Sequence, residues 1–173
     1  MTETITTGAP KALTPGGGDA RWFLANLATV KLTGEETGGL FSLVEMVGAK
    51  GDMPPLHVHH RDDETFMVTE GEITLYVGGE TLRGGPGSIL FAPREVPHTY
   101  RIESETARMN VISSPPVFPE FVLETSVPAE RPTLPPGPPA VDPERLVEVA
   151  ARYGIEIIAP PGVLPQSCST MQR

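Results

Sequence analysis

The sequence has one cysteine and no long apolar run, and each scarcity excludes a class of protein. A single cysteine, Cys168, rules out an internal disulfide framework and is typical of the reducing cytoplasm. No apolar run approaches the roughly 18 residues of a membrane-spanning helix. The N-terminal stretch MTETITTGAPKALTPGGG lacks the charged start and the apolar run of a signal peptide. We therefore expect a cytoplasmic protein.

Basic residues are also scarce. The chain has 13 Lys and Arg against 22 Asp and Glu, which gives a formal net charge of −9. A surface of this sign repels the phosphates of nucleic acids and of anionic lipids. With 39% hydrophobic residues among 173, the chain can bury one core but is too short for two ordinary domains. We expect one domain that binds neither nucleic acid nor membrane.

Glycine and proline are abundant, at 18 and 20 residues, and divide the chain into short segments. Residues 1–20 have no periodicity and predict a flexible N-terminal arm. Residues 21–126 contain about nine short strands without an intervening helix, which predicts an antiparallel sandwich or barrel. Residues 127–173 predict a stiff Pro-rich crossing, a helix and a tail. The predicted class is all-β, with a short C-terminal helix.

Two helical segments are predicted after the last barrel strand. Residues 115–125 favour a short helical turn over the barrel. A second helix begins at Asp142, a natural N-cap followed by Pro143, and ends at Gly154, which suits a C-cap. Residues 155–158 form an apolar run that could add an edge strand.

Three of the four histidines fall in a pattern that predicts a metal site. Residues two apart in a strand face the same side, so His57 and His59 point together. The four residues between them and Glu64 can turn the chain so that this carboxylate, on the next strand, meets them. His98 must come from a non-adjacent strand. The four are the predicted ligands.

Three imidazoles and one carboxylate suit one divalent transition metal (Ni, Mn, Fe, Co or Zn) better than Ca or Mg. An octahedral ion would keep two positions open, as catalytic metals do. Neighbouring polar residues receive other interpretations. His60 faces the opposite side and is expected to be a structural or surface residue, and Asp62 and Asp63 are expected to form a solvated turn.

At this point the chain resembles the cupin family. Gly51, the two histidines, Glu64 and Gly71 match the first cupin motif at every spacing. The second motif is matched by Gly87, Pro93 and His98. It departs at Glu95, where Gly is usual, and at Ile102, where Asn is usual.

The resemblance implies a single-domain jelly-roll β-barrel with the metal in its mouth, often as a homodimer. The layout of barrel, Pro-rich crossing and C-terminal helix also resembles small bacterial quercetinase-like monocupins. That resemblance implies an aromatic substrate, dioxygen as co-substrate, and Glu64 as both ligand and base.

The pocket wall is expected from residues that alternate with the ligands along their strands, and from nearby apolar side chains that could equally fill a core. Two of these wall residues follow Glu64 along its strand, and two follow His98. The predicted lining is Phe66, Val68, Tyr100, Ile102, Phe41, Met109 and Phe118, with Leu43, Phe91 and Phe121 as further candidates.

Three functions remain open on the sequence. The first is a metal-dependent dioxygenase that cleaves a ring in a flavonol-like or polyketide-like aromatic. The second is a metal-dependent isomerase, cyclase or dehydratase of natural-product biosynthesis, which needs no oxygen. The third is a non-catalytic cupin that binds a small ligand.

Overall fold

The computed structural model describes residues 8–137 and 142–165, which form twelve strands and two α-helices. Cys168, the first seven residues of the predicted arm, and Pro138 and Pro139 of the crossing lie outside these ranges. No helix among the described residues is long and apolar enough to cross a membrane. The strands are β1 Asp19–Phe23, β2 Asn26–Leu32, β3 Ser42–Ala49, β4 Leu56–His59, β5 Asp63–Glu70, β6 Ile73–Val77, β7 Glu80–Gly84, β8 Ile89–Ala92, β9 His98–Ile102, β10 Thr106–Ser114, β11 Val127–Pro128 and β12 Ile155–Ala159.

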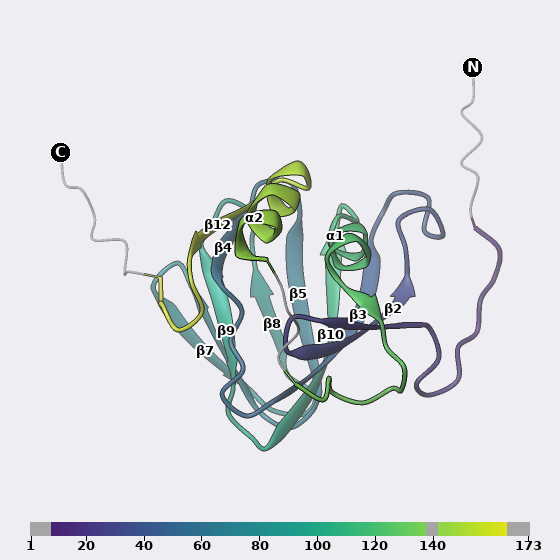
Figure 1. Ribbon diagram of the computed structural model, residues 1–173, viewed down its shortest axis with the longest axis horizontal. Helices are drawn as coiled ribbons and strands as arrows, with labels where there is room; N and C mark the ends of the chain where they lie inside the picture. Colours follow the sequence, from purple (N-terminus) through teal and green to yellow (C-terminus); the bar gives the residue numbers. More distant parts are fainter. Residues whose placement is uncertain (1–7, 138–141, 166–173) are drawn as a thin grey trace.

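The strands form two antiparallel sheets that enclose one core (Figure 1). The first sheet has the order β11-β1-β2-β3-β10-β5-β8, and the second has the order β12-β4-β9-β6-β7. This arrangement confirms the predicted all-β barrel.

Alternating burial shows why these segments are strands. In β10, buried and less buried residues alternate along the strand, the period expected when one face lies against a core. Gly78 and Gly79, with φ of 56° and 91°, make the two-residue hairpin between β6 and β7 that only positive φ allows. Leu24, at φ 53°, turns the chain between β1 and β2, which pair as an antiparallel hairpin.

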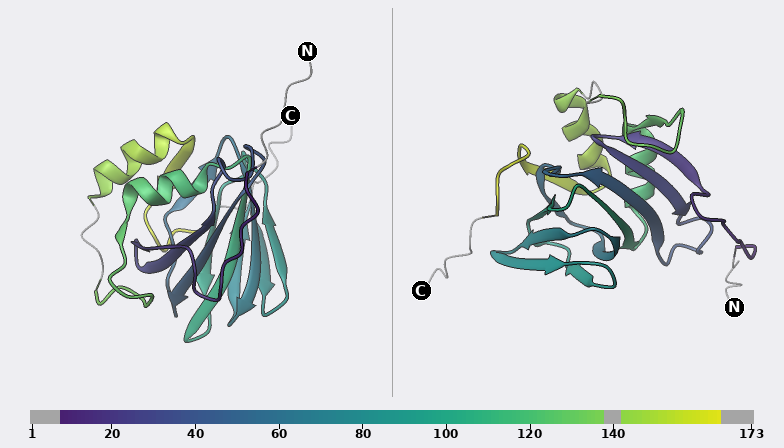
Figure 2. Two further views of the ribbon diagram at one scale, coloured as in Figure 1. Left: turned by 90° about the vertical axis from the view of Figure 1, so that its right-hand side faces the viewer. Right: turned by 90° about the horizontal axis from the view of Figure 1, so that it is seen from below.

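Helices α1 (Phe118–Thr125) and α2 (Pro143–Arg152) lie beside one another at one end of the barrel (Figures 1 and 2). The predicted N-cap of α2 is confirmed, since the Asp142 carboxylate accepts from the Glu144 N–H at 3.0 Å. Gly154 follows the helix at φ 75°. The Tyr153 hydroxyl donates to Glu124 of α1 at 2.8 Å and ties the two helices together.

The segment after residue 126 contributes strands to both sheets. Strand β11 pairs with β1, and β12 pairs with β4 along its length. The edge strand expected at residues 155–158 therefore exists, and it lies against the strand that carries two predicted metal ligands.

Candidate metal centre

The four predicted ligands come from both sheets. His57 and His59 lie on β4, and His98, on the adjacent strand β9, is the direct cross-strand partner of His57. Glu64 lies on β5 in the opposite sheet. The expectation that His98 comes from a strand not adjacent to β4 is therefore wrong. The next strand along the chain, β5, lies in the other sheet and forms no hairpin with β4. Residues 60–62 carry the chain from one sheet to the other, so the carboxylate faces the imidazoles across the barrel.

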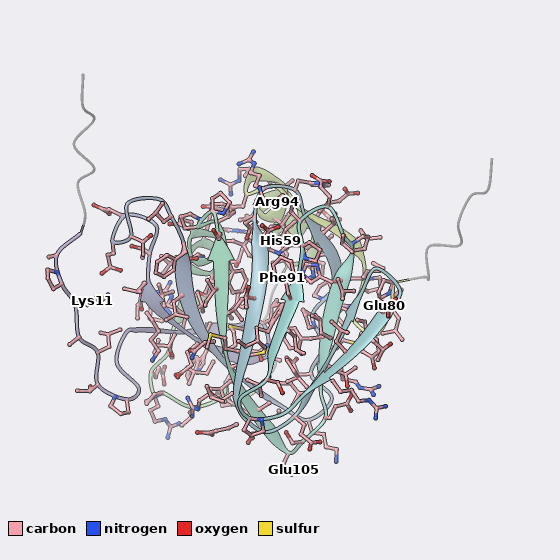
Figure 3. The ribbon with its side chains drawn as sticks, turned by 180° about the vertical axis from the view of Figure 1, so that it is seen from behind. Lys11, His59, Glu80, Phe91, Arg94 and Glu105 are labelled. Carbon is pink, nitrogen blue, oxygen red and sulfur yellow. The ribbon has the colours of Figure 1, made fainter. Side chains whose placement is uncertain are left out.

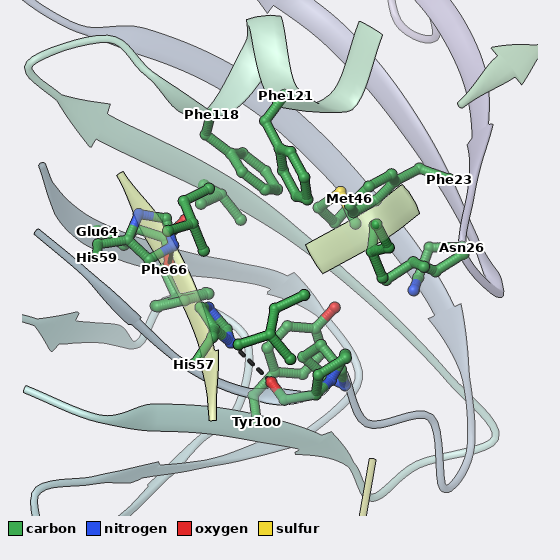
Figure 4. Close-up of a pocket in the computed structure, with 17 residues that line it drawn as sticks. Phe23, Asn26, Met46, His57, His59, Glu64, Phe66, Tyr100, Phe118 and Phe121 are labelled. Carbon is green, nitrogen blue, oxygen red and sulfur yellow. Dashed lines mark hydrogen bonds and ion pairs between the residues drawn. The ribbon is translucent and has the colours of Figure 1, made fainter. Parts of the chain in front are cut away.

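One ligand atom from each of the four side chains lies within 4.8 Å of the other three. The Glu64 Oε2 atom is 3.1 Å from His98 Nε2 and 3.5 Å from His59 Nε2. His59, His98 and Glu64 are only 1–3% exposed, whereas His57 is partly exposed. Figure 4 shows His57, His59 and Glu64 grouped at one end of a pocket.

The outer nitrogens of all three imidazoles are held by oxygen acceptors. Nδ1–H of His57 donates to the Pro55 carbonyl at 2.7 Å, and that of His98 donates to the Val96 carbonyl at 3.0 Å. Nδ1 of His59 lies 2.9 Å from Asp62. Because Nδ1 carries the proton in these bonds, Nε2 of a neutral ring is left free as a ligand.

The surroundings shift the pKa values of the cluster. Burial, assisted by His98 and His59, lowers the pKa of His57 to about 3. Burial opposes ionisation of Glu64, but the three imidazoles overcome it and lower its pKa to about 2. Burial also opposes charge on His59, yet Glu64 and Asp62 together raise its pKa. The cluster thus contains an ionised carboxylate and at least one neutral imidazole near neutral pH.

This donor set fits a divalent transition metal. Free Nε2 atoms and an ionised carboxylate converge from several sides, and a shared cation relieves the crowding of these electron-rich atoms. Ligand types do not select one ion among Ni, Mn, Fe, Co and Zn. Four protein ligands leave open positions in an octahedral shell.

The acidic residues before Glu64 differ in their surroundings. Asp62 is fully buried, so its predicted place in a solvated turn is wrong. Asp63 is partly exposed and binds Arg94 at 2.8 Å. His60 is exposed and lies 2.9 Å from Glu95 and 3.1 Å from Glu156 of β12, which agrees with a surface role.

The departure from the second motif leaves the turn intact. Glu95 stands where Gly is usual and adopts a φ of 64°, the left-handed conformation that Gly takes most easily. Its N–H donates to the His59 carbonyl at 2.8 Å. Glu95 therefore adopts a conformation that suits Gly, and the turn before His98 is bonded to the strand that carries His59.

An apolar pocket of about 60 Å³, the inner cavity, begins at the cluster. Aromatic side chains from both sheets and α1 surround it, with Leu146 of α2 and two residues of β12 (Figure 4). Its lining is Phe23, Leu24, Asn26, Met46, Pro54, Pro55, His57, His59, Glu64, Phe66, Tyr100, Val111, Phe118, Phe121, Leu146, Ile155 and Ile157.

The predicted wall residues divide into three groups. Phe66, Tyr100, Phe118 and Phe121 line the inner cavity. Val68, Ile102 and Met109 are buried in the core but do not line the inner cavity. They lie farther along their strands, away from the barrel mouth. The remaining three do not line the inner cavity, because they lie just before or on the outer face of the first sheet. They are Phe41, which is 37% exposed, Leu43, which is partly buried, and Phe91, which is 50% exposed (Figure 3).

Sequence reasoning missed the part of the wall that comes from distant segments. Phe23 and Met46 lie on β1 and β3. The alternation of apolar residues along these strands predicts that both side chains face inward, but it does not distinguish lining the pocket from filling the core. Leu146, Ile155 and Ile157 could have been predicted to face the barrel, since they occupy apolar positions of the predicted helix and edge strand.

The fold and the ligand cluster resemble those of cupins. Residues 44–114 match the sequence model of the Cupin domain family. It is 28% identical over 160 residues to the Quercetin 2,3-dioxygenase of Bacillus subtilis (strain 168), covering 92% of this chain and 48% of that protein. An uncharacterized protein of Streptomyces coelicolor is 37% identical over 57 residues, covering 33% of this chain and 54% of that protein. The chain spans about half the length of these curated relatives.

Solved structures share the fold at low identity. The polyketide cyclase RemF from Streptomyces resistomycificus gives a TM-score of 0.53 at 22% identity, over 61% of this chain and 80% of that chain. A cupin domain from Schizosaccharomyces pombe gives 0.52 at 13% identity, over 62% and 75% of the two chains. These likenesses support the barrel and carry no assignment of activity.

Proposed function

We propose that this protein is a metal-dependent dioxygenase that cleaves a ring of a flavonol-like or polyketide-like aromatic substrate with dioxygen. The observation that carries the proposal is the His3Glu cluster at one end of an aromatic-lined cavity. The relative named Quercetin 2,3-dioxygenase supports the reaction class, because its similarity extends over 92% of this chain.

The residues of the chain would bind and orient the substrate. Glu64 is buried and its pKa is lowered to about 2, so it stays ionised and a carboxylate oxygen can accept a hydrogen bond from a substrate hydroxyl. Phe66, Phe118 and Tyr100 would stack against or flank the aromatic ring and exclude water from it. A bound metal would supply Lewis acidity toward the hydroxyl oxygen and a place for dioxygen.

A larger hollow next to the inner cavity has room for the rest of the substrate. This outer groove measures about 1020 Å³ and shares Asn26, Leu146 and Ile157 with the inner cavity. It also includes Pro54 and Pro55, which precede His57. The inner cavity, at about 60 Å³, is smaller than the roughly 150 Å³ that holds one benzene, so only the edge of the reacting ring would enter it while the rest of the substrate lies in the groove.

The assay combines metal analysis with oxygen uptake. The purified protein should contain about one transition-metal ion per chain and consume oxygen with quercetin or a related flavonol. His98→Ala should lose both the metal and the activity, whereas His60→Ala, which removes an exposed histidine, should keep both. Absence of oxygen uptake by the metal-loaded protein across a set of flavonols and anthraquinone-like compounds would refute the dioxygenase.

The same experiment separates the other functions. Product formed without oxygen would assign the site to an isomerase, cyclase or dehydratase, with Glu64 moving protons. Ligand binding without turnover would assign it to a binding protein. A homodimer and a cytoplasmic location are further parts of the proposal, and light scattering of the purified protein tests the first.

A further inference from the structure

Asp62 is a charged side chain buried beside the metal cluster. It is 0% exposed and comes from the segment that joins β4 to β5. Its Oδ1 lies 2.9 Å from Nδ1 of His59, and its Oδ2 accepts from the Ser113 hydroxyl at 2.7 Å. A carboxylate buried this completely is stable only when both oxygens have partners, and here both do.

Ser113 extends these contacts to helix α1. Its Oγ accepts from the backbone N–H of Val117 at 3.1 Å and of Phe118 at 3.4 Å. The N-cap residue of α1, Val117, provides no side-chain cap, so a serine of β10 accepts from two of the N–H groups at this helix start. The contacts therefore run from a metal ligand to the helix that carries Phe118 and Phe121 over the inner cavity.

We propose that Asp62 is a positioning residue that fixes His59 with its proton on Nδ1, and that the Asp62–Ser113 pair couples the metal site to the placement of α1. The inference rests on the metal site of the proposed function. Fixing the proton on Nδ1 leaves Nε2 directed at Glu64 and at a bound ion. A shift of His59 on metal binding would then pass through Asp62 and Ser113 to the first turn of α1.

The first test measures the affinity of the full chain for Co²⁺. Asp62→Ala should weaken binding about 10- to 100-fold, as loss of a partner behind a ligating histidine does. Asp62→Asn keeps an oxygen acceptor and should recover part of that loss. Asp63→Ala is the matched control, because its carboxylate faces Arg94, and its affinity should stay within about twofold of wild type.

The second test begins with the zinc-loaded wild type, whose spectrum does not depend on how any variant folds. An imidazole nitrogen–proton correlation spectrum should show His59 bound through Nε2 with its proton on Nδ1. In hydrogen exchange, metal should protect the amides of Val117 and Phe118. Ser113→Ala should abolish that protection, while Ser114→Ala, which removes an exposed neighbouring hydroxyl, should keep it.

The outcomes separate this inference from the proposed function. Wild-type protein that binds no metal overturns the metal site and this inference with it. Wild-type protein that binds metal, with Asp62→Ala equal in affinity, overturns the positioning role alone. Coordination of the metal by His59 through Nδ1 would also overturn the positioning role of Asp62. Metal protection of α1 that persists in Ser113→Ala overturns the coupling to the helix.

Discussion

Acid should destabilise the metal-free protein through His57. Burial beside His98 and His59 lowers the pKa of this imidazole to about 3, against an ordinary value of 6.5. Between these two values the unfolded chain binds a proton that the folded chain does not, so stability falls as the pH falls. Above pH 6.5 the ring is neutral in both states and contributes no pH dependence.

The size of the effect follows from the width of that window. Each pH unit within it changes the free energy of unfolding by about 1.36 kcal/mol. Acidification from about pH 8 to about pH 4.5 spans two units below the ordinary value of 6.5, so His57 alone should remove up to about 2.7 kcal/mol. This is a large part of the total stability of a small domain, which is about 5–15 kcal/mol.

Urea unfolding at a series of pH values, with a chelator present, measures this loss. His57→Gln cannot titrate, so its stability should fall less steeply on acidification than that of wild type. The difference between the two curves reports the titration of His57 together with its coupling to His59, His98 and Glu64. Parallel curves would show that His57 gains a proton as easily in the folded chain as in the unfolded one, and would refute the reasoning.

Three further predictions concern packing, capping and metal. Phe121→Ala should lower the free energy of unfolding by about 3–5 kcal/mol in urea, because the ring is 6% exposed, whereas Phe91→Ala, at 50% exposed, should change it by about 0.5 kcal/mol or less. Asp142→Ala should cost about 1 kcal/mol in the same assay, because it removes the cap of α2; an equal stability would mean that the cap contributes nothing. Zinc at about 100 times its dissociation constant should stabilise wild type by about 2.7 kcal/mol in thermal melts and leave His98→Ala unchanged, and an equal rise in both would place the ion elsewhere.

The strands were predictable because their signals are local. Alternating burial along β10 and the paired glycines after β6 depend only on neighbouring residues. The partners of each strand were not predictable in this way. Alternation fixes the face on which a residue lies within its own strand, but it says nothing of which other strand pairs with it. For that reason the sequence placed His98 away from β4, whereas its strand is the direct neighbour of β4.

The candidate site shows the same division. His57 and His59 were predictable as a pair because two-residue spacing orients both without reference to the rest of the fold. Leu146 and Ile157 reach the inner cavity from segments more distant in the sequence, through docking of α2 and pairing of β12 with β4. Only the assembled barrel brings them to the cluster.

Asp62 and Asp63 show where local reasoning fails within two adjacent residues. Both belong to a short polar segment, and polarity alone predicts a solvated turn. That segment crosses from one sheet to the other at the mouth of the barrel, so one carboxylate is directed inward to His59 and Ser113 and the next outward to Arg94. A buried carboxylate is tolerated there only because an imidazole and a hydroxyl donate to it. The burial of Asp62 is therefore a consequence of the same crossing that brings Glu64 to face the three histidines.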